Sequence, residues 1–239
     1  MRSSILSKSD CYAEAFTLPR GVTSIVGGGG KTTLMLRLAR ELVESGARAI
    51  LTTTTHIFPP DGIRTVSGAT KAEIETVLRE KRIVCLGLPT EQGKLCQPII
   101  TFSEMETLAD YVIVEADGSK HLPLKAPASH EPVIPAETKL VIAVAGMDGE
   151  GKMISEAVFR PELYAALLET DESQRITPAD IAWVLTHDNG QHKGVSRQMR
   201  FAILLNKADD ERLKDAAIKT VMHLNHERVE QVVIGSVGM

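Results

Sequence analysis

Residues 23–33 read Thr-Ser-Ile-Val-Gly-Gly-Gly-Gly-Lys-Thr-Thr, and this stretch decides the fold. A short β-branched run precedes the glycines and leucines at helical spacing follow the threonines, so the order is strand, loop and helix. Glycine has no Cβ, which lets consecutive backbone N–H groups turn toward one anion. The helix that begins near Lys31 points its positive end at the same place. The stretch therefore predicts a phosphate-binding loop.

The loop residues have expected roles in binding a nucleoside triphosphate. Lys31 would reach the β- and γ-phosphates, and the Thr32 hydroxyl would bind Mg²⁺. The whole predicted nucleotide-binding set of the loop is Gly27, Gly28, Gly29, Gly30, Lys31, Thr32 and Thr33. Counted from Gly27, the loop reads G-x-x-G-K-T and is shorter than the full Walker A pattern. Loops this short resemble those of Mur-type peptide ligases and folylpolyglutamate synthetases, which bind ATP. The alternative is a flexible glycine turn with an exposed lysine.

Composition indicates a globular α/β protein. The 239 residues are 43% apolar and 24% charged, and we divide them into an N-terminal segment, 1–20, and a single nucleotide-binding domain, 21–239. The net charge of -4 gives no indication of a nucleic-acid partner. Three cysteines without C-x-x-C spacing favour a reducing cytoplasmic setting. Apolar runs are too short for a signal peptide or a transmembrane span, so we expect neither.

Predicted strands alternate with predicted helices after residue 20. The strands are apolar throughout, which is typical of a parallel sheet covered on both faces. We expect an α/β fold, a P-loop NTPase-like three-layer sandwich with a mostly parallel central sheet. Predicted strands lie at 49–53, 82–86, 111–114, 140–145, 201–205 and 229–234, and predicted helices at 70–81, 103–109, 160–169, 178–186 and 209–224.

Four details of this prediction depend on local signals. Thr70 with Glu73 three residues later indicates a capping box, and Ser103 is expected to cap the helix that ends at Ala109. Residues 87–102 are expected to form a hairpin or loop. The proline-rich stretch 120–138 is expected to be a long ordered loop. A weakly amphipathic segment around Ile5, Leu6 and Tyr12 would form a docking helix.

Two carboxylates, Glu115 and Asp117, follow the apolar strand 111–114 directly. A carboxylate at this position can hold Mg²⁺ or orient an attacking water. We therefore predict Lys31, Glu115 and Asp117 as catalytic residues, and Thr32, Glu115 and Asp117 as metal ligands. Either carboxylate could instead cap a helix or serve a turn, and which of them serves the metal stays open.

Residues 206–209 read Asn-Lys-Ala-Asp after an apolar strand, which matches the N-K-x-D pattern of guanine-specific GTPases. The Asp209 carboxylate would accept hydrogen bonds from N1–H and N2–H₂ of guanine, Lys207 would pack over the base, and Asn206 would brace the loop. The alternative is that Asp209 caps the following helix. The expected cofactors are Mg²⁺ with GTP or ATP.

Threonines 52–55 and His56 end the second strand of the domain. Thr54 or Thr55 would approach the γ-phosphate or Mg²⁺ and His56 a substrate, although threonine also simply favours strands. His223 and His226 share a helical face, but no third metal ligand accompanies them, so a solvated face is the preferred interpretation.

The short glycine loop, the run 51–59 (LTTTTHIFP), the run 112–127 (VIVEADGSKHLPLKAP) and the run 204–209 (LLNKAD) together resemble a family of bacterial P-loop proteins. These are the YqeC-type accessory proteins of selenium-dependent molybdenum hydroxylases. The resemblance spans most of the chain from about residue 20 onward. It implies a nucleotide-binding protein that helps to mature a molybdenum hydroxylase and handles selenium or the pterin-type cofactor, with the hydroxylase or its cofactor as partner.

Three function classes stay open at this point. The first is a slow, partner-gated NTPase of the maturation kind. The second is an ATP-dependent small-molecule ligase or kinase, in which Lys120, His121 and Lys125 would line a pocket for an anionic substrate. The third is a nucleotide-binding module without turnover. The oligomeric state also stays open, with a homodimer as one possibility.

Overall fold

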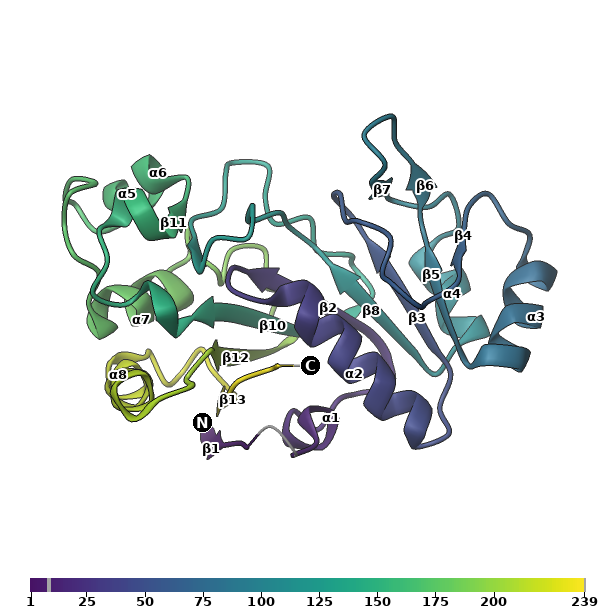
Figure 1. The fold of residues 1–239 in the computed structure, drawn as a ribbon, viewed down its shortest axis with the longest axis horizontal. Coiled ribbons are helices and arrows are strands. Elements are labelled where there is room, and N and C mark those ends of the chain that lie inside the picture. Colours follow the sequence, from purple (N-terminus) through teal and green to yellow (C-terminus); the bar gives the residue numbers. More distant parts are fainter. Residues whose placement is uncertain (8–9, 239) are drawn as a thin grey trace.

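A parallel sheet forms the centre of this computed structural model, which describes residues 1–7 and 10–238 (Figure 1). Within the described residues the sheet has nine strands, and every neighbouring pair is parallel. Their order is β1 (Arg2–Ile5), β13 (Gln231–Ile234), β12 (Arg200–Asn206), β10 (Thr138–Gly146), β2 (Gly21–Gly27), β8 (Tyr111–Glu115), β3 (Ala49–Thr53), β5 (Ile83–Leu86) and β4 (Thr65–Val66). The strand that enters the glycine loop, β2, thus lies in the middle of the sheet.

Helices cover both faces of the sheet. One face carries α1 (Tyr12–Ala15) and α2 (Lys31–Glu44), and the other carries α3 (Lys71–Lys81), α4 (Phe102–Leu108), α7 (Pro178–Thr186) and α8 (Glu211–His223). The alternation of strand side chains explains this division, because Ile25 packs with the leucines of α2 whereas Val26 packs on the opposite face. This arrangement confirms the predicted α/β three-layer architecture. No helix in the described ranges is long and apolar enough to cross a membrane.

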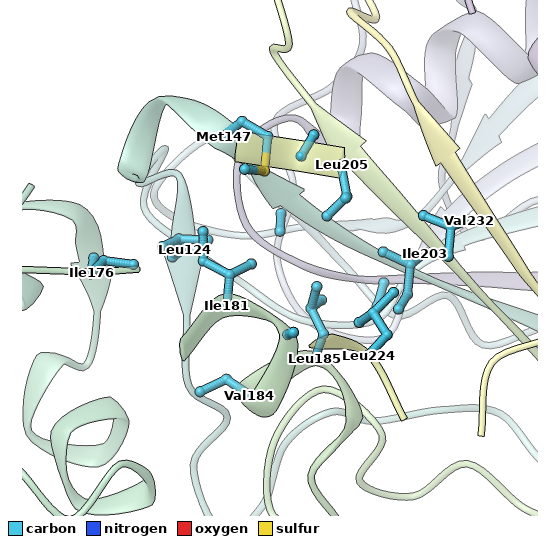
Figure 2. Close-up of a cluster of buried hydrophobic side chains, with 14 of the residues drawn as sticks. Leu124, Met147, Ile176, Ile181, Val184, Leu185, Ile203, Leu205, Leu224 and Val232 are labelled. Carbon is cyan, nitrogen blue, oxygen red and sulfur yellow. The ribbon is translucent and has the colours of Figure 1, made fainter. Parts of the chain in front are cut away.

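The core around α7 joins the sheet to a region of short elements. Figure 2 shows Ile203 and Val232 of the sheet close to Leu185 of α7 and to Leu224. Leu124 reaches this core from β9, a short strand in a segment expected to be a loop. The short elements of this region are β9 (Leu124–Lys125), η1 (Met147–Gly149), α5 (Ile154–Ala157), β11 (Val158–Phe159) and α6 (Pro161–Leu167). A separate pair, β6 (Leu88–Pro89) and β7 (Leu95–Cys96), lies near β5 at the other end of the sheet (Figure 1).

The predicted cap of α3 is confirmed and that of α4 is wrong. Thr70 and Glu73 form the expected capping box. The cap of α4 is Thr101, whose hydroxyl accepts a hydrogen bond from the Glu104 N–H while the Glu104 carboxylate accepts from the Thr101 N–H. Ser103 lies inside the helix and donates its hydroxyl to Glu137. The predicted hairpin in 87–102 is confirmed, because β6 and β7 pair antiparallel.

Two long-range pairings differ from the expectation. The helix predicted around Ile5, Leu6 and Tyr12 is confirmed at Tyr12, where α1 begins, and is wrong at Ile5, which ends β1. The strand β1 pairs with β13 at the edge of the sheet, with Arg2 opposite Gln231. An edge strand exposes most of its side chains, so it lacks the apolar run by which the inner strands were recognised. Within 120–138, β9 pairs with β11, and the stretch is therefore not loop throughout. Partners this distant in sequence leave no local signal.

Replacing Thr70 by alanine is expected to lower the free energy of unfolding by about 1 kcal/mol, because the first turn of α3 loses its side-chain acceptor. Thr76→Ala on the same helix is the matched control, since the Thr76 hydroxyl bonds only to a carbonyl of its own helix. Urea unfolding of both variants is the measurement. Equal stability of the two variants would contradict the role of the cap.

Candidate functional site

The carboxyl ends of the central strands bring the predicted site residues to one edge of the sheet. Ile25 of β2 lies opposite Glu115 of β8, and Glu115 in turn lies opposite Thr53 of β3. On the other side of β2, Gly146 at the end of β10 lies opposite Asn206 of β12. In open parallel sheets this is the edge at which ligands bind.

Close packing requires the glycines of the loop. At Gly27, φ is 97° and an added Cβ would lie 2.3 Å from the carbonyl oxygen of Val144. At Gly29, φ is 77° and an added Cβ would lie 2.4 Å from the backbone nitrogen of Gly146. Any side chain at either position would therefore force the loop away from β10.

The N–H groups of the loop divide into two sets. Those of Gly27, Gly28 and Gly29 donate to the Asp117 carboxylate, the Val144 carbonyl and the Leu122 carbonyl, at 3.0, 2.9 and 2.9 Å. The glycine run predicts amides that turn toward one anion, whereas in this structure these three are bonded to protein acceptors. The first helical bond of α2 runs from Leu34 N–H to the Gly30 carbonyl. The N–H groups of residues 30–33 consequently have no acceptor among the described residues and form the positive end of α2.

Thr32 and Glu115 meet beside this helix end. The Thr32 hydroxyl donates to the Glu115 carboxylate at 2.7 Å. Burial raises the pKa of Glu115, and the nearby Lys31 ammonium and the Thr32 hydrogen bond only partly oppose this effect. A hydroxyl and a carboxylate oxygen at this spacing fit two ligands of Mg²⁺, whose other ligands are usually waters and phosphate oxygens. Accordingly, the described residues contain no cluster of three or more metal-binding side chains.

A chain of alternating charges extends from Lys31, and we name it the ion chain: Lys31, Asp117, Lys125, Glu131 and Arg160. The Lys31 ammonium lies 3.2 Å from Asp117, the Lys125 ammonium lies 3.1 Å from Asp117 and 2.7 Å from Glu131, and Arg160 binds the same Glu131 oxygen. Asp117 is fully buried and also accepts the Gly27 N–H. It is therefore bonded to both lysines and to the glycine loop, whereas Glu115 faces Thr32.

Lys125 and Arg160, the two cations of the ion chain that contact Glu131, strongly favour its ionised form. Burial alone would raise the pKa of this carboxyl group, but hydrogen bonds from Arg160 and Lys125 outweigh burial and lower the pKa to about 2.

The Asn-Lys-Ala-Asp segment contacts the glycine loop through its first residue. The Asn206 amide donates to the Gly29 carbonyl at 2.7 Å and accepts the Val237 N–H at 2.9 Å, so Asn206 braces the loop as expected. Lys207 pairs with Asp148 at 2.9 Å. The alternative role of Asp209 as a helix cap is wrong: Asp210 caps α8, and Asp209 accepts the Ser236 hydroxyl.

A cavity of about 500 Å³ opens beside the end of α2. It gathers Lys31, Thr32 and Glu115 with Thr55, His56, Lys120 and His121, all of which sequence patterns had singled out. Residues 206–209 are not among its lining residues, and the Thr54 hydroxyl donates to the Val133 carbonyl. Sequence reasoning missed five further lining residues: Phe58, Lys94, Glu131, Phe159 and Arg160. Phe58 lies in the run 51–59 without an assigned role, and no motif marks the other four, which come from three separate segments of the chain.

Comparison with known proteins gives two matches. A family model described as "YqeC protein" matches residues 23–162, which is more than half of the chain. A protein of Escherichia coli (strain K12), named "Uncharacterized protein YqeC", is 30% identical over 223 residues, which cover 90% of this chain and 87% of the relative. The family match contains the glycine loop, the threonine run, both site carboxylates and the ion chain.

The low pKa of Glu131 predicts a pH dependence of stability. A carboxyl group whose pKa falls from its usual 4.5 to about 2 on folding stabilises the folded state above pH 4.5, and this contribution is lost as the pH falls toward 2. Glu131→Gln is expected to be less stable than wild type by about 3 kcal/mol at pH 6 and by progressively less toward pH 3.

Urea unfolding at several pH values checks this expectation. Glu211→Gln, which changes an exposed pair with Lys214, is the control and is expected to follow the wild-type pH profile. A constant difference between wild type and Glu131→Gln at all pH values would contradict the assignment.

Proposed function

We propose that this chain, which belongs to the YqeC family, is a nucleoside-triphosphate-binding P-loop protein that takes GTP with Mg²⁺. We further propose that it assists the maturation of a selenium-dependent molybdenum hydroxylase. The observation that carries the nucleotide site is the 2.7 Å contact between the Thr32 hydroxyl and Glu115 at the open end of α2. The maturation role rests on the resemblance of the glycine loop and of the runs 51–59 and 112–127.

The donors available to a triphosphate support this proposal. Residues 30–33 line the cavity, and their N–H groups form the positive end of α2, a helix of 14 residues. The first residue of that helix is the buried Lys31. In binding, Lys31 exchanges part of its contact with Asp117 for a phosphate oxygen, and Asp117 keeps Lys125 as its partner. Mg²⁺ held by Thr32 and Glu115 would neutralise charge on the β- and γ-phosphates.

The strand order supports guanine as the base. Residues 206–209 follow β12, which lies two strands from β2, or about 10 Å at the usual strand spacing. A nucleotide with its phosphates at α2 can therefore place its base near Asp209. Asp209 stands exposed at this edge, and Asn206 links the segment to Gly29.

A second candidate function is an ATP-dependent ligase or kinase acting on a cofactor precursor. The cavity favours it, because space lined by Lys120 and His121 adjoins the end of α2. Base preference discriminates the two candidates.

Lys31→Ala is expected to weaken binding of a fluorescent GTP analogue at least 100-fold (roughly 3 kcal/mol) because a buried cation at the phosphates is lost. Thr32→Val preserves size and charge, so it should lose chiefly the enhancement of binding by Mg²⁺. Lys219→Ala, an exposed position on α8, is the control. Fluorescence titration with and without Mg²⁺ is the measurement, and normal binding by folded Lys31→Ala would refute the proposed site.

Asp209→Asn is expected to weaken the binding of GTP and to strengthen the binding of xanthosine triphosphate. Xanthine carries a carbonyl where guanine carries its 2-amino group, and an amide can donate to that carbonyl. Asp215→Asn on the exposed face of α8 is the matched control. Competition titrations with GTP, ATP and xanthosine triphosphate decide the matter. If the order of affinities for GTP, ATP and xanthosine triphosphate is the same in wild type and Asp209→Asn, the proposal that Asp209 recognises guanine is refuted and the ligase or kinase is favoured.

A further inference from the structure

We propose that the cavity contains a second-ligand site, which binds a small aromatic molecule carrying a phosphate or carboxylate group. The residues that form it are Phe58, Lys94, Lys120, His121, Phe159 and Arg160, and we name this part of the cavity the basic chamber. It adjoins Lys31 and Thr32, so the ligand would lie beside the terminal phosphate. In that placement the inference rests on the proposed nucleotide site.

Charge is the first argument for an anionic ligand. Lys94, Lys120 and Arg160 line the basic chamber, and in the described residues neither lysine has a carboxylate within ion-pair distance. The carboxylates on the same cavity are Glu115, bonded to Thr32, and Glu131, bonded to Lys125 and Arg160. In a chain of net charge -4, this wall is a local excess of positive charge that suits an oxyanion.

Aromatic faces are the second argument. The Lys94 ammonium lies 5.1 Å from the centre of the Phe58 ring, and the Phe58 side chain is 56% exposed. The Phe159 ring has the Arg160 guanidinium at 4.5 Å and the Lys120 ammonium at 5.3 Å. Each ring thus holds a cation over its face. A planar molecule that stacks on such a ring would have a cation within reach of its acidic group.

Backbone conformation is the third argument. Lys120, His121 and Arg160 have φ values of 47°, 64° and 64°, in the left-handed region that residues other than glycine rarely adopt. All three line the same cavity although they come from two separate loops. Unfavourable conformations of this kind gather at ligand sites, where the surrounding structure holds side chains in place.

The size of the cavity fits two ligands that share it. Its volume of about 500 Å³ lies within the range of small-molecule sites. Residues 30–33 at the end of α2 and the residues of the basic chamber line the same cavity, so terminal phosphates and a bicyclic aromatic acid can be accommodated together.

Calorimetry with 1-naphthyl phosphate tests the inference, with the protein saturated by Mg²⁺ and a non-hydrolysable GTP analogue. We expect the probe to bind wild type, and 1-naphthol, which lacks the acidic group, to bind at least tenfold more weakly. The double variant Lys94→Ala/Lys120→Ala is expected to lose at least tenfold in probe affinity and to keep nucleotide affinity within twofold. The double variant Lys94→Arg/Lys120→Arg should restore affinity for the probe, and Lys219→Ala should change the affinity for neither the probe nor the nucleotide.

Three outcomes of this experiment would overturn the inference. They are equal binding of the probe by wild type and by the alanine double variant, equal binding of 1-naphthol, and no binding to wild type that holds nucleotide. Titration with 1-naphthoate in parallel identifies the preferred acidic group as phosphate or carboxylate. If wild type fails to bind nucleotide, the proposed function fails. The probe is then titrated against the nucleotide-free protein, where dependence on Lys94 and Lys120 still decides the chamber.

Discussion

The contact of Asp117 with two buried lysines is the constraint on which the site depends. Moving charges out of water is costly, and loss of one partner leaves a buried charge uncompensated, typically at about 3–5 kcal/mol. Asp117 therefore holds Lys31 at the end of α2 and Lys125 in β9 together, and through the Gly27 N–H it holds the glycine loop as well. One carboxylate thus joins the segment 27–31 to β9. Asp117 is engaged by these partners, and Glu115 is the carboxylate that accepts the Thr32 hydroxyl.

The glycine loop has a packing role in addition to the anion binding that we propose. Gly28 and Gly29 donate to carbonyls of β10 and of the segment before β9, and a Cβ added at Gly28 would lie 2.9 Å from the carbonyl oxygens of Leu122 and Pro123. The segment whose Leu122 carbonyl accepts the Gly29 N–H comes directly before Lys125. The ion pair of Lys125 with Asp117 therefore helps to hold this segment against the glycine loop. In consequence, the amides left for the proposed phosphate are those of residues 30–33, which line the cavity.

Sequence patterns predicted the features that depend on neighbours in the chain. The glycine loop, α2, the inner strands and the Thr70 cap follow from local spacing and from apolar runs, and Asn206 contacts the loop as its pattern implied. The missed features depend on partners far away. β1 exposes its side chains and is defined only by β13, and Phe159 gains its role from cations on another loop. Likewise, Asp117 contacts Lys125 whereas Glu115 contacts Thr32, and no pattern near either carboxylate reveals this difference.

The pairing of β1 with β13 constrains the order in which the sheet can form while the protein is being synthesised. The backbone of β1 bonds to β13, and the N-terminus lies beside this edge in Figure 1. While the ribosome is translating, Arg2–Ile5 has no strand to join until residues 231–234 have emerged. The sheet can therefore be completed at this edge only after β13 has emerged, so a nascent chain can pair β2 with β8 and β10 beside the glycine loop before β1 meets β13.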